Sequence, residues 1–568
     1  MGKNKPTKYD NYTKEQLIAK LQKLEKQRYG LVWEDKPEEV AKQCETELPI
    51  LAEVKDKAIN KKPDCLTHYI IEGDNYHSLY TLNFTHKKKI DVIYIDPPYN
   101  TGNKSWRYNN NYVDKEDRFR HSKWLSFMYK RLKLSKRLLS NNGIVICAID
   151  DYEMAGLKLV MDSVFGEFNR LSTCVVVHNP RGRNDDKFFA TQHEYMLIYA
   201  KNRDYANINE FELTAEDKKQ YGKEDDISPY AETSFIRTGN NSNRFERPNL
   251  YYSIYFNEKE NSLSLNKTKE AIELLPLNKS LEEKTWRWGK ETFNKLKDTE
   301  LFVKEVKGEY RVYKKRRLKT NTGKRPKTVW YESKYDASSN GIMLLNKIFG
   351  KRNIFNYPKS IYAVKDALKV VSQQNSIILD FFSGSGTTGQ AVLELNKEDG
   401  GNRQFIMCTN NENQICEEVT YPRIQKVIDG YADVDGIPTN VKYFKTEFVP
   451  AIKTDNDKRV LVTKSTELLC LAEDTFDVVK QNKQKKDFAI FRSTNKLTAI
   501  IYDEDSIAKC VAELNKLNIE IETVIYVFSY DHTYSEEDFA GLKNPFVVKP
   551  IPEAILNVYR KAQKISTK

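Results

Sequence analysis

The chain has 568 residues, 39% of them hydrophobic and 12% aromatic, with a formal net charge of +12. This length exceeds what one hydrophobic core supports, so we expect several domains, and this hydrophobic content excludes a wholly disordered chain. The excess of basic residues favours a polyanionic partner such as nucleic acid, although many basic proteins bind none.

The membrane, metal and disulfide-rich classes of protein are disfavoured. No stretch approaches the ~18 apolar residues that a membrane span needs, and the first residues contain no apolar signal-peptide core. The cysteines are scattered and none forms a C-x-x-C pair, so we expect neither a zinc site nor a disulfide framework. The sequence therefore predicts a cytoplasmic protein without a metal or a membrane segment.

The N-terminal segment, residues 1–60, contains a predicted helix over residues 13–29. Thr13 and Gln16 have the spacing of a capping box, and three leucines after them share one face. That apolar face would either pack on its own domain or form a dimer contact.

Strands and helices alternate from residue 66 to about residue 204. The alternation predicts a parallel sheet that is covered by helices on both faces. The predicted elements are a strand, a turn and a helix within 67–82, a strand that ends before Asp96, a helix at 124–139, a strand after the Asn-Asn-Gly turn at 141–143, a helix at 153–166, and strands at 173–179 and 193–202.

The rhythm breaks over residues 200–340, which are polar, irregular and rich in Asn, Lys and Arg. Alternation returns near residue 341 with a helix, the strand 376–380, a further helix and the strand 402–410. A tail from about residue 450 contains the short apolar segments 459–463, 487–493, 497–503 and 524–530 around a helix, and it reads as a small α/β domain.

The first diagnostic motif is Asp96-Pro97-Pro98-Tyr99, which directly follows the apolar strand "DVIYI". The exocyclic amine of a nucleobase is a poor nucleophile, because its lone pair is delocalised into the ring. The Asp96 carboxylate and the Pro97 carbonyl would accept hydrogen bonds from such an amine and stabilise the positive charge that develops on it. Tyr99 would stack on a base that has left its helix. An ordinary proline turn is the alternative reading.

The second motif is the glycine-rich stretch "LDFFSGSGTTGQAV", which lies between a predicted strand and a predicted helix. Gly384, Gly386 and Gly389 fit the pattern G-x-G-x-x-G, in which glycines let the backbone approach a ligand at a helix N-terminus. A nicotinamide-dependent dehydrogenase is therefore an alternative. Against it, this pattern usually opens its domain, and the strand end that should hold a ribose-binding acid holds Asn410 and Asn411.

The segments "DPPYNTGN" and "DFFSGSGTT", in that order and separated by a polar region, resemble the β group of DNA adenine-N6 methyltransferases. Segments such as "HEYMLIYAKN" and "FNYPKSIY" resemble, more narrowly, the modification subunit of type III restriction-modification systems. The resemblance implies an α/β, Rossmann-like fold that uses S-adenosylmethionine, with a circularly permuted motif order.

The same resemblance implies five segments along the chain. They are an N-terminal helical segment (1–60), a catalytic half of the methyltransferase domain (61–204), an inserted target-recognition domain (205–340), a cofactor-binding half (341–450) and a small C-terminal α/β domain (451–568).

Positions that match the family's motifs take on implied roles. The catalytic residues would be Asp96, Pro97, Pro98 and Tyr99. The S-adenosylmethionine site would comprise Lys359, Ser360, Asp380, Phe382, Ser383, Gly384, Ser385, Gly386 and Thr387, with Glu412 as the candidate ribose ligand.

Basic residues provide candidate DNA contacts. The densest run comprises Lys314, Lys315, Arg316 and Arg317, followed by Lys324 and Arg325, and it would contact phosphates. Arg181, Arg183, Arg244 and Arg247 are spaced for contacts with base edges or with phosphates. A solvated charged surface is the alternative reading of the run.

We therefore expect a site-specific enzyme that methylates the N6 amine of a flipped adenine in double-stranded DNA. An aspartate before the two prolines favours adenine over the N4 amine of cytosine. The implied partners are a second copy of the chain and a helicase–nuclease restriction subunit. An orphan DNA methyltransferase, an RNA or protein methyltransferase and a catalytically idle DNA-binding subunit stay open as alternatives.

Overall fold

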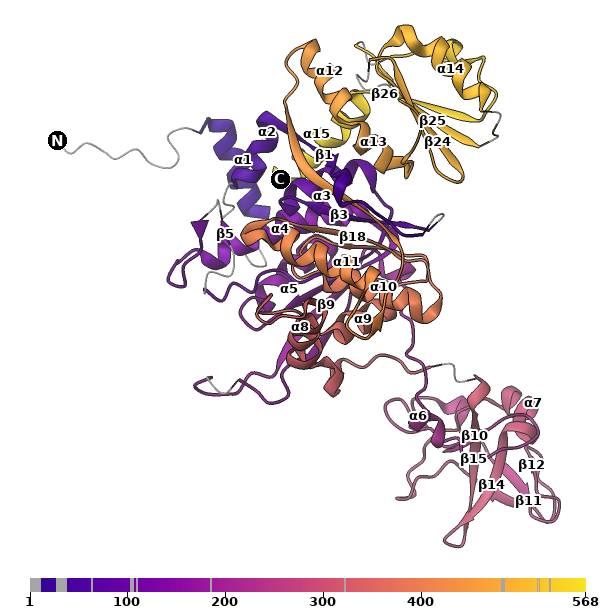
Figure 1. Cartoon of the computed structure of the whole chain (residues 1–568). Helices are drawn as coiled ribbons and strands as arrows, with labels where there is room; N and C mark the ends of the chain where they lie inside the picture. The colour runs from indigo at the N-terminus through magenta and orange to yellow at the C-terminus, as the bar shows by residue number, and fades with distance from the viewer. Residues whose placement is uncertain are drawn as a thin grey trace. The chain divides into compact units, whose positions relative to one another are not determined.

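The computed structural model divides the chain into two compact units (Figure 1). The first unit comprises residues 1–209 and 327–568, and the second comprises residues 210–326. The structure describes residues 12–26, 38–62, 65–102, 107–108, 111–183, 186–320, 323–481, 486–517, 519, 521–530 and 533–567. Much of the predicted N-terminal segment, including residues 1–11 and 27–37, therefore lies outside the described residues.

An 11-stranded sheet forms the centre of the first unit. Its spatial order is β1 (Glu47–Glu53), β21 (Asn440–Pro450), β3 (Thr67–Glu72), β18 (Gln404–Thr409), β17 (Ile377–Asp380), β4 (Ile90–Ile95), β7 (Leu139–Ile149), β9 (His193–Ala200), β8 (Arg170–Val177) and β16 (Val329–Trp330), and β2 (Ile59–Asn60) pairs separately with β21.

The six strands from β21 to β7 are parallel, as the alternation of strands and helices predicts. Antiparallel pairing appears on both sides of them, since β1 runs against β21 and β9 runs against both β7 and β8. The predicted Asn-Asn-Gly turn lies inside β7, where the register with β4 shifts between Ile90–Leu139 and Val92–Ile144. The α/β fold is confirmed, whereas a wholly parallel sheet is not.

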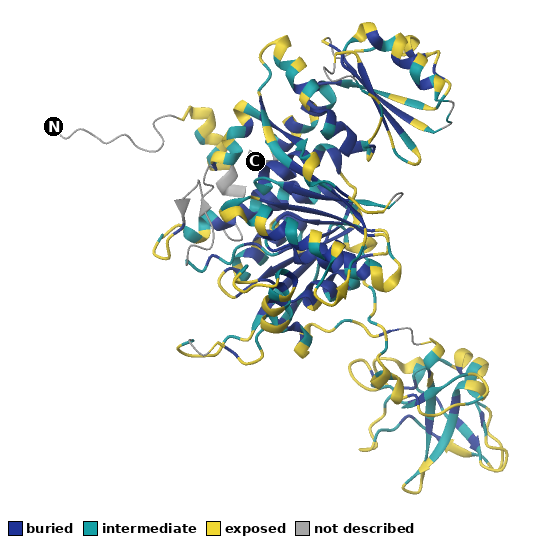
Figure 2. Ribbon diagram, in the orientation of Figure 1, coloured by how far each residue is buried: buried dark blue, intermediate teal, exposed yellow. Residues whose placement is uncertain are grey.

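Helices cover both faces of this sheet. They are α3 (Asn75–Thr85), α4 (Arg120–Leu138), α5 (Met154–Phe165), α9 (Ile361–Val371), α10 (Thr387–Asp399) and α11 (Tyr421–Asp429). Alternate strand residues such as Ile93, Val145 and Cys408 belong to the same buried cluster as α3, α4 and α5. On the opposite face, Met407 lies against Gly389 of α10. Because both faces are buried, the central strands are mostly apolar and appear largely dark blue in Figure 2.

The N-terminal helix α1 (Lys14–Lys26) begins with the expected capping box. The backbone N–H of Gln16 donates to Thr13 Oγ1 at 3.3 Å, and the backbone N–H of Thr13 donates to Gln16 Oε1 at 2.9 Å. Two apolar residues of this helix stay exposed, Ile18 at 45% and Leu21 at 59%. A short helix, α2 (Glu39–Thr46), then leads into β1.

The second unit has its own small core, which is built on Phe235, Ile254, Trp286, Phe293 and Val312. Its elements are α6 (Ala215–Lys219), a three-stranded sheet of β10 (Tyr230–Ser234), β15 (Glu309–Arg317) and β14 (Leu301–Val306), a second three-stranded sheet of β12 (Ser262–Ser264), β11 (Ile254–Asn257) and β13 (Ile272–Leu274), and α7 (Lys290–Glu300).

The C-terminal tail forms a five-stranded sheet within the first unit. Its strands are β22 (Asp477–Gln481), β23 (Phe488–Arg492), β24 (Lys496–Ile501), β25 (Glu522–Phe528) and β26 (Phe546–Ile551), with α14 (Ile507–Lys516) on one face. The other face joins the main core through α13 (Thr466–Glu473) and α15 (Glu553–Thr567). Tyr559 of α15 is fully buried and donates a hydrogen bond to the carbonyl of Pro49 in β1.

One apolar segment of the tail departs from its strand-like pattern. Residues 459–463 lie in the helix α12 (Asp455–Lys464). Thr454 and Asp457 form a reciprocal capping box at its start, which favours the helix over an extended segment. No helix in the described part of the chain is long and apolar enough to cross a membrane.

Candidate active site

The two sequence motifs meet at the carboxyl ends of neighbouring strands. Asp96 follows β4, Asp380 ends β17, and these strands pair in parallel through Ile378–Val92 and Leu379–Ile93. A cleft of about 2090 Å³ opens there, and residues of both motifs line it. Open parallel sheets bind ligands at the carboxyl ends of their strands. The site lies between two adjacent strands whose following connections go to opposite faces of the sheet.

Asp96 belongs to a charged network inside this cleft. Lys359 Nζ lies 3.3 Å from Asp96 Oδ1 and 2.5 Å from Glu194 Oε2. The Tyr99 hydroxyl donates to the same Glu194 oxygen at 2.9 Å and also contacts Lys359 Nζ. Three elements distant in the sequence therefore fix the position of the Asp96 carboxylate.

Burial and charge act in opposite directions on these groups. Burial raises the pKa of Asp96, while the Lys359 charge opposes that rise. Burial works against the charged form of Lys359 too, but the two facing carboxylates raise its pKa above the ordinary value. Although burial tends to raise the pKa of Glu194, the Lys359 charge and hydrogen bonds from Lys359 and Tyr99 hold it below its usual range. The arrangement keeps a lysine ammonium between two acids.

Lys359 has contacts that the sequence does not suggest. We expect it in the cofactor site, and it lines the cleft, but its ammonium group also contacts Asp96 and Tyr99 of the catalytic motif and Glu194. Sequence reasoning missed Glu194 altogether, because "HEYMLIYA" reads as an ordinary buried strand. A buried acid at the start of such a strand was the available signal, since a fully buried carboxylate needs a cation as partner.

The backbone of the proline pair is held rigidly. Both prolines line the cleft, and Trp124 Nε1 of α4 donates to the Pro98 carbonyl at 2.7 Å, so the Pro97 carbonyl is the one that suits an amine. The next residue, Asn100, has a φ of 55° and donates its side-chain amide to Glu153. Since the asparagine is fully buried, this contact anchors the whole turn.

The glycine-rich turn connects β17 to α10. Gly384 has a φ of 46° and Gly386 a φ of 79°, and both values favour glycine. Asp380 accepts hydrogen bonds from the Phe382 backbone N–H at 2.9 Å and from the Thr388 hydroxyl at 2.5 Å. Burial raises the pKa of Asp380 to about 7. Asp380 thus braces the turn as well as lining the cleft.

Nearly all predicted cofactor-binding residues line this cleft. They are Lys359, Ser360, Asp380, Phe382, Ser383, Gly384, Ser385, Thr387 and Glu412. Gly386 is the exception: it lies behind the turn, where its backbone N–H donates to the Ser383 carbonyl at 2.7 Å. Its role is to shape the turn rather than to line the cleft.

A buried arginine that the sequence did not single out supports the turn from behind. Arg423 of α11 is fully buried, and its Nη1 donates to Thr387 Oγ1 at 2.8 Å and to the Ser385 carbonyl at 3.2 Å. The Thr420 hydroxyl donates to the Gly384 carbonyl at 2.6 Å. Burial lowers the pKa of Arg423 to about 10. These contacts hold the turn open toward the cleft.

Beyond β18 the chain offers one acid to the cleft. Asn410 and Glu412 line the cleft, whereas Asn411 uses its side-chain oxygen to accept the backbone N–H groups of Cys416 and Glu417. Glu412 therefore stays the candidate for binding a ribose, and Asn411 does not.

Two buried polar atoms in the cleft, Tyr94 Oη and His178 Nδ1, lack a hydrogen-bond partner among the described residues. Buried polar groups are normally satisfied, so such a pair points to a polar ligand. An added Cβ at Gly384 would meet nothing closer than Phe355 Cζ and the Phe382 carbonyl oxygen, both at 3.8 Å, so this side of the turn leaves room for a ligand that carries polar groups.

The cleft-lining residues give no sign of a metal centre. Among the described residues, no group of three or more His, Cys, Asp and Glu side chains is placed to hold a metal ion. The cysteines are all free, and Cys147 and Cys174 are buried core residues, as their apolar neighbours predict.

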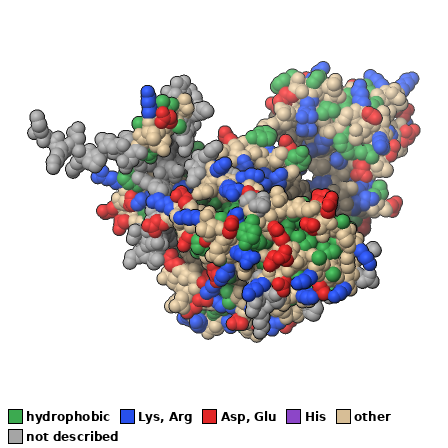
Figure 3. All heavy atoms as spheres, turned by 90° about the horizontal axis from the view of Figure 1, so that it is seen from above, with side chains coloured by type: hydrophobic (Ala, Val, Ile, Leu, Met, Phe, Trp, Pro, Cys, Tyr) green, Lys and Arg blue, Asp and Glu red, His purple; other side chains and the backbone are tan. Residues whose placement is uncertain are grey.

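Of the predicted DNA contacts, two belong to the first unit. Arg181 and Arg183 are exposed in the loop after β8, and Arg183 lines the cleft. On the face shown in Figure 3, Lys and Arg side chains are interspersed with Asp and Glu, so the net positive charge does not form a single patch there.

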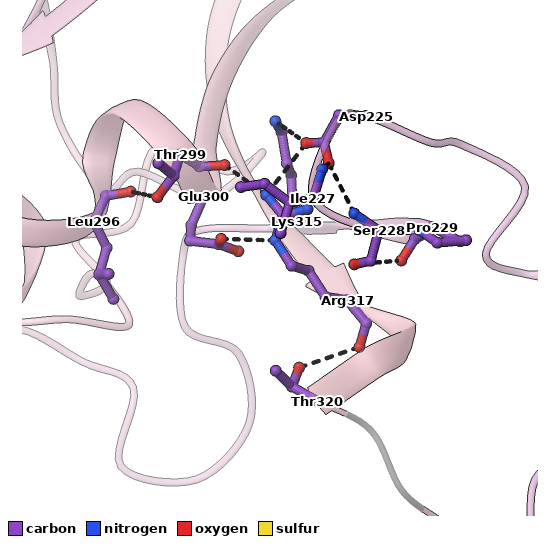
Figure 4. A network of polar contacts seen from close by, with 10 residues as sticks. All are labelled: Asp225, Ile227, Ser228, Pro229, Leu296, Thr299, Glu300, Lys315, Arg317 and Thr320. Atoms are coloured by element: carbon purple, nitrogen blue, oxygen red, sulfur yellow. Dashed lines mark hydrogen bonds and ion pairs between the residues drawn. The ribbon is translucent and has the colours of Figure 1, made fainter.

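The basic run of the second unit does not act as one surface. It lies on β15, where successive side chains point to opposite faces. Arg317 is 3% exposed, and its guanidinium contacts Asp225 at 2.7 Å and Glu300 at 2.7 Å (Figure 4). Lys315 binds the same aspartate at 2.7 Å. Arg317 therefore does not fit the predicted phosphate contact, because its guanidinium is buried and two half-buried acids occupy its donors.

The remaining cations of this unit are more accessible. Lys314 is half-buried against the Trp288 ring, while Arg316, Arg244, Arg247, Lys324 and Arg325 are exposed. Several have acidic neighbours: Arg244 pairs with Glu283 at 2.8 Å, and Lys324 pairs with Asp217. Their role in binding DNA stays a prediction.

Residues 90–420 match the sequence family described as DNA methylase, N6_N4_Mtase. The chain belongs to this DNA methylase family. The match includes both motifs and the inserted second unit, so the expected class of enzyme is confirmed and the dehydrogenase alternative is set aside.

Named relatives of this DNA methylase fall into two types. The chain is 31% identical over 421 residues to the type III EcoPI Mod subunit of Escherichia phage P1, covering 68% of this chain and 64% of that protein. It is 29% identical over 384 residues to the StyLTI Mod subunit of Salmonella typhimurium, covering 63% and 55%. It is also 32% identical over 411 residues to the type II methyltransferase M.KpnI of Klebsiella pneumoniae, covering 69% and 94%. The expected likeness to type III modification subunits is confirmed, although less than two thirds of each of those proteins is matched.

Proposed function

We propose that this DNA methylase transfers a methyl group from S-adenosylmethionine to the N6 amine of an adenine that has been flipped out of double-stranded DNA. The observation that carries the proposal is the single cleft in which Asp96 and the glycine-rich turn lie at the ends of adjacent parallel strands. Asp96 would hold the amine in this cleft, and the glycine-rich turn would hold the methyl donor.

Asp96 and Pro97 would hold the amine. Two acceptors that bind both N–H groups of the amine direct its lone pair away from the ring and stabilise the developing positive charge. The Lys359 ammonium, 3.3 Å from Asp96, opposes the rise in the pKa of Asp96 that burial causes and so favours the ionised carboxylate. Tyr99 lines the same cleft and offers a ring for stacking on the base.

The glycine-rich turn would hold the cofactor. S-adenosylmethionine, when bound, supplies a methyl group on a positively charged sulfur. The residues from Phe382 to Ser385 would contact its amino-acid part, and Glu412 would accept hydrogen bonds from its ribose hydroxyls. The unpartnered Tyr94 hydroxyl lies in the same cleft and would complete the polar contacts.

Mass spectrometry of nucleosides tests the proposal directly. Plasmid DNA incubated with the protein and S-adenosylmethionine should yield N6-methyladenine, and Asp96→Asn should abolish the product while leaving cofactor binding within about twofold. Detection of N4-methylcytosine instead would show that the target base is cytosine and not adenine. Methylation of RNA, but not of DNA, would overturn the choice of substrate.

We further propose that the chain is the modification subunit of a type III restriction-modification system. Two relatives carry that description, and M.KpnI, a type II enzyme, keeps a stand-alone methyltransferase open. The expected partners are a second copy of the chain and a helicase–nuclease subunit, and the expected location is the cytoplasm. A large helicase gene beside this one, whose product co-purifies with the chain, would support the proposal. A neighbourhood without such a gene would favour the orphan enzyme.

The exposed apolar residues of α1 are a place to test for the dimer. Sedimentation of the wild type should give twice the mass of one chain, and Leu21→Lys should shift it toward the monomer. A wild-type monomer at micromolar concentration would overturn the dimer.

A further inference from the structure

The loop between β8 and β9 exposes two adjacent phenylalanines. Phe188 is 83% exposed and Phe189 is 91% exposed. Among the exposed large hydrophobic residues of the first unit, only Tyr357, at 83%, is as accessible as Phe188. Single exposed apolar residues are common on protein surfaces and need no explanation. Two neighbouring phenylalanine rings, each almost fully in water, are less common.

The loop that carries them is well anchored. Its two sides are joined where the Asn179 backbone N–H donates to the Gln192 carbonyl at 3.0 Å and the Arg183 N–H donates to the Thr191 carbonyl at 3.2 Å. Asp186 accepts the Thr191 N–H at 2.8 Å, a hydrogen bond that lowers the pKa of the aspartate. The exposure of the two rings is therefore a property of a bonded loop and not of a free chain end.

The base of the loop borders the cleft. Asn179 and Arg183 line the cleft, and the strand that leaves the loop carries Glu194, the partner of Lys359. The rings are thus attached, through a few residues on each side, to the rim of the site that would receive the flipped base.

The loop has an excess of positive charge, which suits a nucleic acid. Arg181, Arg183 and Lys187 precede the aromatic pair and outnumber Asp185 and Asp186, and Lys187 Nζ lies 5.4 Å from the centre of the Phe188 ring. Cations provide contacts with phosphates, while aromatic rings stack on bases or enter base steps. An apolar protein partner would instead be expected to meet an apolar surface around the rings.

We propose that Phe188 and Phe189 enter the DNA helix at the position that the target base leaves and fill the gap in the base stack. This inference rests on the proposed function, since a base must leave the helix to reach the buried Asp96. Extrusion of a base costs stacking and pairing energy, and a ring that occupies the gap stabilises the open state. The two rings therefore act on the DNA and not on the methyl transfer itself.

Kinetics on paired and unpaired targets tests the proposal. After the target site is mapped by sequencing methylated plasmid, kcat/KM is measured on a duplex with a normal pair and on one with an abasic site opposite the target. The double variant Phe188→Ala/Phe189→Ala should lose about 10- to 100-fold on the paired duplex, but no more than about twofold on the abasic one. Equal losses on both substrates, or no loss on the paired one, would overturn the proposal.

Phe168 provides a matched control. It is 68% exposed, it has Arg203 against its ring, and it lies after α5 and not on the cleft-lining loop. Phe168→Ala should leave both kcat/KM values within about twofold of the wild type. A loss equal to that of the loop variant would attribute the effect to general weakening of the fold, and the proposal would fall.

A spectroscopic arm works even when no methylation is found. Tryptophan fluorescence is quenched when its ring stacks on bases, so Phe189→Trp should lose fluorescence on addition of duplex DNA, after subtraction of the wild-type signal. Phe168→Trp should not. Absence of quenching in Phe189→Trp at saturating DNA would overturn insertion. A change that depends on protein concentration alone would instead assign the rings to a contact between two copies of the chain.

Discussion

Lys359 faces two carboxylates, and only one of them belongs to the motif that stands out in the sequence. Asp96 is recognisable from its neighbours Pro97 to Tyr99, because the chemistry of an amine acceptor explains each residue type. Glu194 is not, since its role depends on the contact with Lys359 at 2.5 Å, which joins β9 to the segment before α9. A pairing between residues so far apart in the chain follows from the folded sheet and has no local pattern.

This pairing predicts a pH effect for Lys359→Gln. The Lys359 charge lowers the pKa of Asp96, while burial and the Glu194 charge raise it. Removal of the lysine takes away its opposing charge and leaves the hydrogen bond from Tyr99 as the remaining lowering effect, so the pKa of Asp96 should rise further. The acidic limb of the kcat/KM profile should then move to higher pH, with activity at pH 7 reduced at least ~10-fold.

Lys334→Gln serves as the control for this profile. Lys334 pairs with Asp366 at 2.8 Å and does not line the cleft. Its removal should leave the acidic limb where the wild type has it. If the acidic limb of the kcat/KM profile does not move in Lys359→Gln, Lys359 does not control the pKa of Asp96.

The basic run on β15 illustrates a second limit at the level of residues. Four consecutive cations suggest one positive surface, but a strand sends neighbours to opposite faces. Arg317 and Lys315 thus point to the same face and form ion pairs with Asp225, while Arg316 points to the other face and is exposed. The alternation of side chains between the two faces could be predicted once the segment was recognised as a strand. The position of Asp225 beside Arg317 could not be predicted.

Among the elements, the glycine-rich turn was predicted most completely. A strand, three glycines and a helix specify its backbone, and the structure places Gly386 at a φ of 79° with an added Cβ only 3.3 Å from the Thr420 carbonyl oxygen. Gly386→Val should therefore distort the turn and weaken S-adenosylmethionine binding more than ~10-fold, as measured by calorimetry, with methylation lost as a consequence.

A valine at Gly400 serves as the control for Gly386→Val, because it tests backbone strain without crowding of the side chain. Gly400 ends α10 with a φ of 67°, but an added Cβ there would meet nothing within 4 Å. Gly400→Val should cost about 1–2 kcal/mol of stability through the strained φ and leave cofactor affinity within twofold. Equal loss of affinity in both variants would show that the turn has no special role.

Most strands and helices between β3 and β9 were predicted because each has a clear period, although the two-residue strands Arg107–Tyr108 and Asn111–Tyr112 and the true start of β7 were not. The elements β1, β21 and α9 were not. Strand β21 contains the charged residues Lys442, Lys445 and Glu447 among its apolar ones, which weakens the strand pattern. Its register is fixed by pairing with β3 on one side and β1 on the other. Residues 459–463 show the reverse error, since their apolar run forms a helix once Thr454 caps it.

The C-terminal sheet contains a charged network that makes stability depend on pH. Glu473 of α13 binds Lys496 at 2.6 Å, Lys549 at 2.8 Å and the Tyr526 hydroxyl at 2.7 Å. Although burial tends to raise it, these partners lower the pKa of Glu473 from 4.5 to about 2. The stabilising effect is therefore complete above about pH 4.5 and is lost as the pH falls toward 2.

Glu473→Gln should lower the free energy of unfolding at pH 7 by on the order of 3 kcal/mol, because it leaves two cations beside a neutral group. The difference from the wild type should shrink as the pH is lowered from 4.5 toward 2, as followed by urea unfolding. Glu504→Gln, at an exposed position near the same sheet, should change little at any pH. A deficit that stays constant across this range would refute the linkage.

For the molecule as a whole, the second unit is an insertion with adjacent ends. Phe211 and Lys324 exchange two backbone hydrogen bonds, of 2.8 and 2.7 Å, so the chain enters and leaves this unit at neighbouring points. Its own core is separate from the main sheet. The polar, irregular composition of residues 200–340 predicted an interruption of the α/β pattern, but not the small sheets inside it, whose strands are only three to nine residues long.

Replacement of residues 210–326 by a short Gly-Ser linker should leave the cleft intact. Cofactor affinity should stay within about twofold of the wild type, while site-specific DNA binding and methylation are lost. Filter binding at several salt concentrations and calorimetry with S-adenosylmethionine measure the two effects. Retained methylation at the original sites would place target recognition in the first unit instead.

The order of strands in the main sheet has a consequence for synthesis of the protein. Strands β3 and β4 are close in sequence, yet β18 and β17, made some 300 residues later, lie between them. At ~5–20 residues per second, a ribosome leaves the facing edges of β3 and β4 unpaired for roughly 15–60 s. Unpaired edges invite association with other chains, so the nascent protein should depend on chaperones during that interval. The same interleaving that builds the cleft thus delays its folding until the cofactor-binding half has left the ribosome.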